Sequence, residues 1–237
     1  MINFFIKRSK IVVDAFTANS DIFRMFPLME AKDNPPSFYK NLRPESDKRN
    51  MKYCAGLIDY YKSGFLIPNV VDIELRSNNR EMLVDDSVKL FVESHPSHQH
   101  GNYFKDHHHV KFNGSWYLRE KTEVKFLMTN LFWHDYKFLP FVVNGVLDFK
   151  YQSGLNVNTF LPKGNYEYFI PAGKPLAQLI PLTEKEVVIK NHHVSKNEII
   201  SNFDTFFFTK TAMYQKKKKF MQKNEKKGRC PFTGRKI

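Results

Sequence analysis

The sequence predicts a mainly β protein, an antiparallel sandwich or barrel, that ends in a basic α-helix. Short apolar runs separated by Gly, Pro, Asn and Asp recur along most of the 237 residues. Within these runs apolar and polar side chains alternate, as in VVDIELR at 70–76, a pattern typical of half-buried strands. After residue 195 the spacing of apolar residues becomes helical and lysines accumulate.

The first 50 residues are predicted to form an irregular segment with one strand, packed on the body of the protein. The run Ile11-Val12-Val13 indicates an opening strand. Turn signals follow at Asn34-Pro35-Pro36 and Arg43-Pro44, because a residue before proline is pushed toward extended backbone. No run of about 18 apolar residues occurs, so we expect no transmembrane segment.

Residues 51–194 are predicted to form the β domain. Asn113-Gly114 is a strong signal for a two-residue hairpin turn. Lys163-Gly164-Asn165 and Ala172-Gly173-Lys174 indicate further turns. The predicted strands occupy residues 64–68, 70–76, 88–94, 110–120, 122–133, 149–161, 166–171 and 175–182.

Residues 195–237 are predicted to form an amphipathic basic helix followed by an extended tail. Ser195 can cap the helix while Glu198 reaches back to it, which is a capping box. The helix is expected to span roughly residues 196–224. Its apolar stripe repeats every seven residues and consists of Phe206, Met213 and Phe220 together with Phe207, Tyr214 and Met221.

The positive charge of the chain is concentrated in this tail. Residues 210–237 hold eleven Lys or Arg and one acid, a net charge of +10, which leaves +3 for the rest of a chain whose total is +13. Lysine supplies charge without reading bases, so we expect the tail to bind nucleic acid without sequence specificity, or an acidic protein surface. The residues expected to do so are Lys216, Lys217, Lys218, Lys219, Lys223, Lys226, Lys227 and Arg229.

Two other interpretations of the tail stay open. In the first, the apolar stripe packs on the β body and the lysines only face water. In the second, the helix lies on an anionic membrane surface, as basic amphipathic helices do.

The histidines indicate a candidate metal site. If His98 and His100 lay on a strand, both imidazoles would share one face, an arrangement that cupin-like Fe or Mn sites use. His95, His98 and His100 are therefore candidate ligands for Fe, Mn or Zn, with a carboxylate from Glu93 or Asp135. The alternative is that this stretch is a solvated loop without a bound ion.

Two motifs occur within residues 144–182: GVLD at 145–148 followed by Tyr151, and GKPLAQLI at 173–180. They resemble the central hairpins of the dUTPase and dCTP-deaminase superfamily, whose fold would make the predicted barrel β-clip-like. The resemblance implies that Asp148 is catalytic and orients a water, and that Gln178 and Tyr151 are ligand-binding. The family's G-R-S-S phosphate motif and Gly-rich C-terminal lid are absent from this sequence. The alternatives are that Asp148 is a turn residue and that Gln178 hydrogen-bonds within the sheet or points to solvent.

A second resemblance covers more of the chain. Residues 49–69, 114–135 and 171–182, followed by the basic tail, look like an uncharacterised protein family of tailed-phage genomes and scattered bacteria. We therefore expect a non-enzymatic phage-type protein, located in the cytoplasm of the host cell or in the virion. Assembly into a homo-oligomer is a further open alternative. The alternative is an enzyme, either a divergent dUTPase-like hydrolase or a His-ligated cupin-like oxygenase.

Overall fold

The computed structural model describes residues 10–43, 50–101, 103–122, 124–131, 141–151, 154–203 and 213–229, and all bounds below refer to them. The fold is mainly β, and its sheets do not close into a barrel. This confirms the predicted fold class, and the open sheets are consistent with a sandwich. The domain division at residues 50 and 194 stays a prediction.

The larger sheet is built around a 14-residue strand, β7. In spatial order its strands are β14 (Val187–His193), β1 (Ile11–Thr17), β7 (His107–Glu120), β11 (Gly154–Pro162) and β9 (Phe141–Val142), and β6 (Val92–His95) also pairs with β7. All these pairs are antiparallel except β1 with β14, which is parallel.

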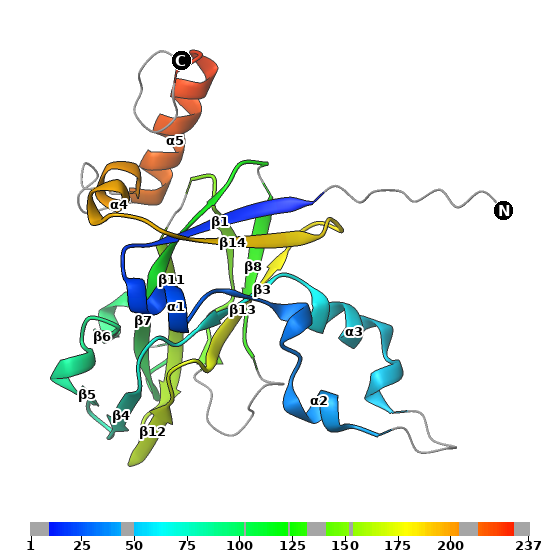
Figure 1. Ribbon diagram of the computed structural model, residues 1–237. Helices are drawn as coiled ribbons and strands as arrows, with labels where there is room; N and C mark the ends of the chain where they lie inside the picture. The colour runs from blue at the N-terminus through cyan, green and yellow to red at the C-terminus, as the bar shows by residue number, and fades with distance from the viewer. Residues whose placement is uncertain are drawn as a thin grey trace.

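Two smaller sheets complete the β structure. The strands of the first, in spatial order, are β10 (Gly145–Asp148), β8 (Lys125–Thr129), β13 (Pro175–Pro181), β3 (Phe65–Pro68) and β2 (Met29–Glu30). Those of the second are β12 (Tyr166–Ile170), β4 (Ile73–Ser77) and β5 (Met82–Val84). Figure 1 shows the sheets crossing in the middle of the molecule.

One hydrophobic cluster joins the three sheets. It contains Trp116 of β7, Phe126 of β8, Phe65 of β3 and Leu75 of β4, each at most 1% exposed. The inward residues of β7 alternate with outward ones along its whole length, as expected for a strand with one buried face. Burial of these large side chains is the main stabilising contribution to the sandwich.

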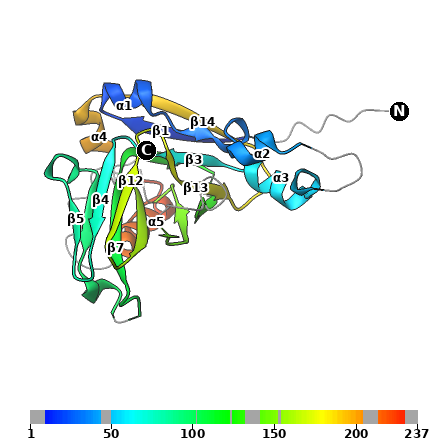
Figure 2. The same cartoon turned by 90° about the horizontal axis from the view of Figure 1, so that it is seen from below.

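The helices lie at the periphery. They are α1 (Ser20–Met25), α2 (Ser37–Asn41), α3 (Ala55–Lys62), α4 (Lys196–Phe203) and α5 (Met213–Lys226), with 3₁₀ turns η1 (Ala31–Asp33), η2 (Met51–Tyr53), η3 (Asp86–Val88) and η4 (Ser97–Gln99). In Figure 2, α2 and α3 lie at one end and the β12–β4–β5 sheet at the other. In Figure 1, α4 and α5 lie together at the top.

Asn113-Gly114 is not a hairpin turn, so that prediction was wrong. Both residues lie inside β7, which continues to Glu120. A Cβ on Gly114 would lie 1.5 Å from the carbonyl oxygen of Leu155, in the β11 stretch where the register shifts between Gly154 and Asn156. Glycine is therefore required here by a close backbone approach and not by a turn.

The N-terminal third contains more helix than its sequence predicted. The predicted opening strand is confirmed as β1, but the segment described as irregular also holds α1 and α2, and residues 55–62 form α3. Asn19 caps α1, because its Oδ1 accepts from the backbone N–H of Asp21 at 2.9 Å and of Ile22 at 3.1 Å. Such short helices carry too little periodic signal to be predicted from the sequence.

The C-terminal helical region begins as predicted. The Ser195 backbone N–H donates to Glu198 Oε2 at 2.9 Å, and the Glu198 N–H donates to Ser195 Oγ at 3.2 Å, so the capping box is confirmed. The described helical residues form two helices, α4 and α5, where one was predicted. Residues 204–212, with Phe206 and Phe207 of the predicted stripe, lie outside the described part, as does the predicted extended tail at 230–237.

Candidate functional site

A row of lysines runs along the outer face of α5. Lys216, Lys219, Lys223 and Lys226 are all exposed and are spaced three, four and three residues apart. At 3.6 residues per turn this spacing places them on one side of the helix, over a length of about 15 Å. We call these four residues the lysine row. Lys227 and Arg229, also exposed, follow it at the end of the helix.

The opposite side of α5 is its buried side. Met221 is 1% exposed and Asn224 is 7% exposed. Lys218 and Glu225 are half-buried on the same side. Of the predicted apolar stripe, the structure describes two side chains: Met221, which is enclosed, and Phe220, which is 43% exposed.

Two oppositely oriented ion pairs join this inner side of α5 to the end of β10 and the turn that follows it. Lys218 Nζ of the helix lies 3.8 Å from Asp148 Oδ2 of the body. Lys150 Nζ of the body lies 2.9 Å from Glu225 Oε1 of the helix. The two ammonium groups also flank Tyr151, at 5.4 Å for Lys218 and 5.5 Å for Lys150 from the ring centroid, within the range of cation–π attraction.

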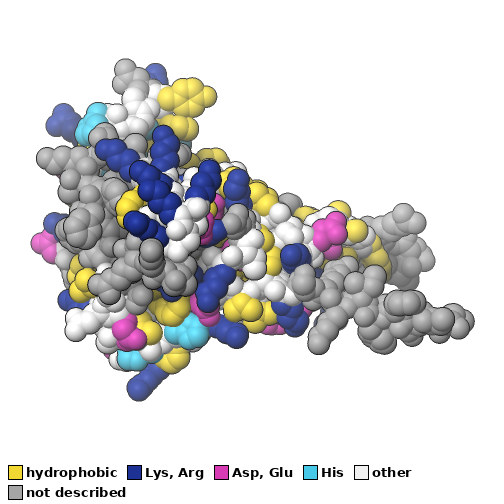
Figure 3. Space-filling view, turned by 90° about the horizontal axis from the view of Figure 1, so that it is seen from above, with side chains coloured by type: hydrophobic (Ala, Val, Ile, Leu, Met, Phe, Trp, Pro, Cys, Tyr) yellow, Lys and Arg dark blue, Asp and Glu magenta, His cyan; other side chains and the backbone are white. Residues whose placement is uncertain are grey.

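These pairs leave the lysine row without a neighbouring acid on its own helix. Glu225 is the acid of residues 210–237, and it faces the body, where it pairs with Lys150. Figure 3 looks down on the end of the molecule that carries α5, and Lys and Arg side chains gather there. The row is thus a line of positive charge that an external anion can approach. The side chain of Lys217 lies outside the described part.

Asp148 and Tyr151 lie beneath this helix, each 5% exposed. Asp148 Oδ1 accepts from the backbone N–H of Lys150 at 3.3 Å, and its carbonyl oxygen accepts from the N–H of Tyr151 at 3.0 Å. These bonds form an Asx-type turn. The structure therefore brings both residues together, as the motif predicted, and Lys218 of α5 lies against both of them.

Gln178 lies apart from that pair and is 1% exposed in β13. Its Nε2 donates to the carbonyl oxygens of Tyr60 and Ser63, at 2.8 Å each. These two carbonyls are at the C-terminal end of α3, where the last carbonyls of a helix lack i+4 donors; the Tyr60 carbonyl also accepts from the Ser63 N–H at 3.3 Å. Both amide hydrogens are used, so Gln178 fastens α3 to the sheet.

The candidate metal ligands are arranged differently from the prediction. His98 and His100 are not on a strand, because His98 is exposed in η4 and His100 follows it. His95 ends β6 and stacks on His109 of β7, with ring centroids 4.9 Å apart, and His100 meets His109 edge-on at 6.1 Å. We call His95, His100 and His109 the histidine cluster.

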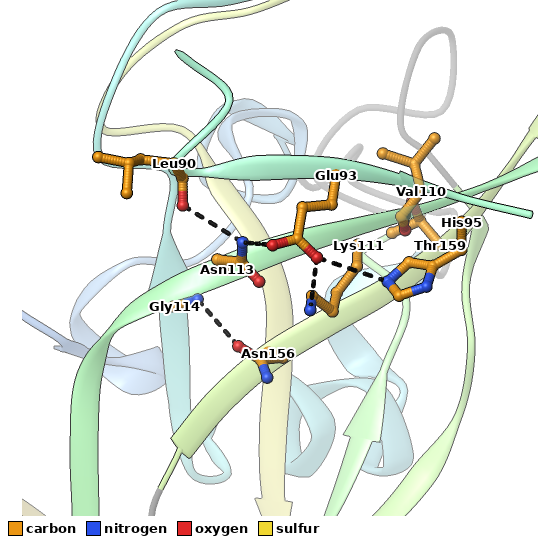
Figure 4. A network of polar contacts seen from close by, with 9 residues as sticks. All are labelled: Leu90, Glu93, His95, Val110, Lys111, Asn113, Gly114, Asn156 and Thr159. Carbon is orange, nitrogen blue, oxygen red and sulfur yellow. Dashed lines mark hydrogen bonds and ion pairs between the residues drawn. The ribbon is translucent and has the colours of Figure 1, made fainter. Parts of the chain in front are cut away.

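A polar network adjoins this cluster on the outer face of the sheet (Figure 4). Glu93 accepts from Lys111 Nζ at 2.8 Å and from Asn113 Nδ2 at 3.0 Å, and its Oε2 lies 3.8 Å from His95 Nε2. The hydrogen bond from Lys111 is the largest cause that lowers the pKa of the Glu93 carboxyl below its ordinary value. Glu93 is therefore committed to Lys111 and Asn113.

Among the described residues, no three His, Cys, Asp or Glu side chains are placed to hold a metal ion together. Asp135, the other predicted carboxylate, lies outside the described part. Metal binding at His95, His98 and His100 stays a prediction that these contacts do not favour. In the same part of the chain, no helix has both the length and the hydrophobicity needed to cross a bilayer.

No protein-family model matches the chain, and no curated protein matches it significantly. The resemblances to the phage family and to the dUTPase superfamily therefore stay predictions. The function has to be argued from the surface that the fold presents.

The sequence predicted the lysines of this surface but not the residues that hold α5 in place, nor the third member of the histidine cluster. Lys150 and Glu225 were missed because their pairing joins residues 75 positions apart, on a strand-loop junction and a helix. His109 was missed because it joins the cluster through strand pairing, in register with His95. The HHH run at 107–109, at the start of a strand pattern, was the signal that could have indicated it.

Proposed function

We propose that this protein binds nucleic acid without sequence specificity, through the phosphate backbone and the lysine row of α5. The observation that carries the proposal is the division of α5 into two faces. Its inner face is held to the body by two ion pairs, while the lysine row faces outward with no acid beside it on the helix.

This geometry suits a phosphate backbone better than an acidic protein patch. A nucleic-acid strand presents one charge per 3.4 Å of duplex axis, a regular line that a straight row of ammonium groups can follow. Lysine is a compact point charge on a flexible stem, so it contacts phosphates without fixing a base sequence. The row is fixed on the body through α5, which lowers the conformational entropy lost when a ligand binds.

The protein proposed here is a binding module and not an enzyme. Asp148, Tyr151 and Gln178 are engaged in contacts that hold α5 and α3 in place. These contacts are the reason that we do not favour the hydrolase alternative. We also propose that the protein is of phage type and is located in the host cytoplasm or the virion. This part of the proposal depends on the family resemblance alone.

The salt dependence of binding tests the proposal. Fluorescence anisotropy would measure the affinity for 20-base-pair duplexes of two unrelated sequences between 50 and 200 mM NaCl. If the four lysines each contact a phosphate, the slope of log K against log salt is about −3.6, a loss of about 10²-fold over this range. The two sequences should give the same affinity. Binding that is insensitive to salt, or absent at 50 mM, would overturn it.

A further inference from the structure

Phe220 is an aromatic side chain on the accessible surface of α5. It is 43% exposed, whereas Met221, the next residue, is 1% exposed. Among the described side chains of α5 these two are the apolar ones, so Phe220 is the apolar side chain that the helix presents outward. An external ligand that approaches the lysine row therefore meets an aromatic ring as well as ammonium groups.

Phe220 lies at the edge of the lysine row, between two of its members. Lys216 precedes it by four residues and Lys223 follows it by three, the spacings at which side chains on a helix are neighbours. At 3.6 residues per turn, Phe220 is rotated around the helix by about 40° from Lys216 and by about 60° from Lys223. Along the helix axis it lies about 6 Å from the first and about 4.5 Å from the second. A phosphate backbone held by these two lysines would therefore pass beside the ring.

The two forms of nucleic acid offer different groups to this surface. Both present phosphates, which the lysine row can contact in either form. In a duplex the bases are stacked on one another, so their faces are covered. In a single strand the base faces are accessible, and aromatic side chains beside a basic surface stack on them without sequence preference, because every base has a π-face. An exposed ring among lysines thus complements an unpaired base and adds nothing to duplex binding.

We propose that Phe220 is a base-stacking platform, and that α5 binds single-stranded nucleic acid through phosphates at the lysine row and an unpaired base at this ring. The inference rests on the proposed function, because the lysine row has to hold the backbone before a base reaches Phe220. It goes beyond that function by assigning single strands as the ligand class and by naming the residue that distinguishes them from duplexes.

A comparison of three ligands by fluorescence anisotropy at 50 mM NaCl tests this platform. The ligands are a 20-nucleotide thymidine strand, a strand of the same length and charge made of abasic sites, and a 20-base-pair duplex. We expect the wild-type protein to bind the thymidine strand at least about fivefold more tightly than the abasic strand. F220A should lose that difference and should bind the duplex within about twofold of wild type, since the duplex is held through its phosphates.

Two further variants separate base stacking from packing within the protein. F220W keeps an aromatic face and should retain the difference between the two strands, whereas F220L keeps apolar bulk without a π-face and should lose it. This pair also carries the test if circular dichroism shows that F220A does not fold. The control is F169A, at a 56% exposed phenylalanine of β12, which lies at the opposite end of the molecule from α5 (Figure 1). It should bind all three ligands as the wild-type protein does.

Equal binding of the thymidine and abasic strands by the wild-type protein would overturn the platform, and so would a difference that persists in F220L. An equal loss in F220A for the thymidine strand and the duplex would also overturn it, because Phe220 would then act by holding α5 in place. In each of these outcomes, salt-dependent duplex binding by the wild-type protein would leave the proposed function standing. Absence of binding to all three ligands would overturn both.

Discussion

Lys218 Nζ of α5 lies 3.8 Å from Asp148 Oδ2 of the β body and 5.4 Å from the centroid of the Tyr151 ring. The two residues that would serve a nucleotide pocket are thereby covered by the most basic helix of the described chain. One helix therefore has two tasks on opposite faces: its inner face is fastened to the body, and its outer face presents lysines. Substitutions on the inner face can therefore test how α5 is held on the body, separately from the binding of nucleic acid by its outer face.

The Lys150–Glu225 ion pair should stabilise the packing of α5 against the β body. Its side chains are 15% and 31% exposed, so the pair is partly screened by solvent. We expect a coupling of about 0.5–1 kcal/mol in a double-mutant cycle with K150M and E225Q, measured by urea denaturation. The charge-swapped K150E/E225K protein should recover most of the stability lost by K150E alone. A coupling free energy of zero would show that this ion pair does not hold α5 to the body.

Gln178 should matter for stability through α3. Q178L removes the side-chain amide that donates to the carbonyls of Tyr60 and Ser63. We expect a loss of about 1–3 kcal/mol of unfolding free energy, because the Ser63 carbonyl loses its Gln178 donor and the Tyr60 carbonyl keeps only the 3.3 Å bond from the Ser63 N–H. The control is Q99A, at an exposed residue of η4, which should change stability by less than about 0.5 kcal/mol. Q178L with wild-type stability would refute the fastening role.

Gly114 and Gly56 should respond to alanine in opposite directions. At Gly114 the added Cβ would lie 1.5 Å from the Leu155 carbonyl oxygen, so β7 and β11 must separate, at a cost of about 1–3 kcal/mol or more. At Gly56, in α3, a Cβ meets nothing within 4 Å, and alanine should stabilise the protein by about 0.5 kcal/mol. Thermal unfolding of G114A and G56A checks both signs, and a stable G114A would show that the two strands are not this close.

The stability of the protein should rise with pH across the histidine range. Burial is the first cause that lowers the pKa of both His108 and His109, so below about pH 6.5 the unfolded chain binds more protons than the folded one. Their stabilising contribution is complete above that pH and is lost as the pH falls through the lowered folded values. Urea unfolding between pH 7.5 and 5 should show this slope. H108N should reduce this slope, because asparagine does not titrate. In the wild-type protein the buried His108 ring, 2.8 Å from the Asn78 carbonyl oxygen, contributes to the slope.

Local pattern was enough to predict several of the strands and the capping box of this fold, but not β14 (Val187–His193) or the short strands β2, β5, β9 and β10. The alternation in 70–76 and the apolar run at 175–182 became β4 and β13, and Ser195 with Glu198 became a helix start. The failures have physical causes. Asn113-Gly114 has turn chemistry, but the closeness of Leu155 determines its conformation, and a neighbouring strand cannot be read from a local dipeptide.

The candidate site was predictable in composition and not in arrangement. The excess of lysine at 216–227 is visible in the sequence, but which lysines face outward depends on where Met221 and Glu225 dock. The role of Gln178 depends on the end of α3, more than a hundred residues earlier, which no local pattern contains. Likewise, His109 joins His95 only through pairing of β6 with β7.

The measurement that tests the central claim most directly compares two variants of equal net charge. One replaces the lysine row with glutamine, as K216Q/K219Q/K223Q/K226Q. The other replaces four exposed lysines outside α5, as K62Q/K105Q/K185Q/K190Q. Duplex DNA binding at 50 mM salt is followed by fluorescence anisotropy, with circular dichroism to confirm that both variants fold. We predict that the first variant loses about 10²-fold or more in affinity while the second stays within about threefold of wild type. Equal losses in the two variants would show that overall charge, and not the lysine row, determines binding, and would contradict the proposed function.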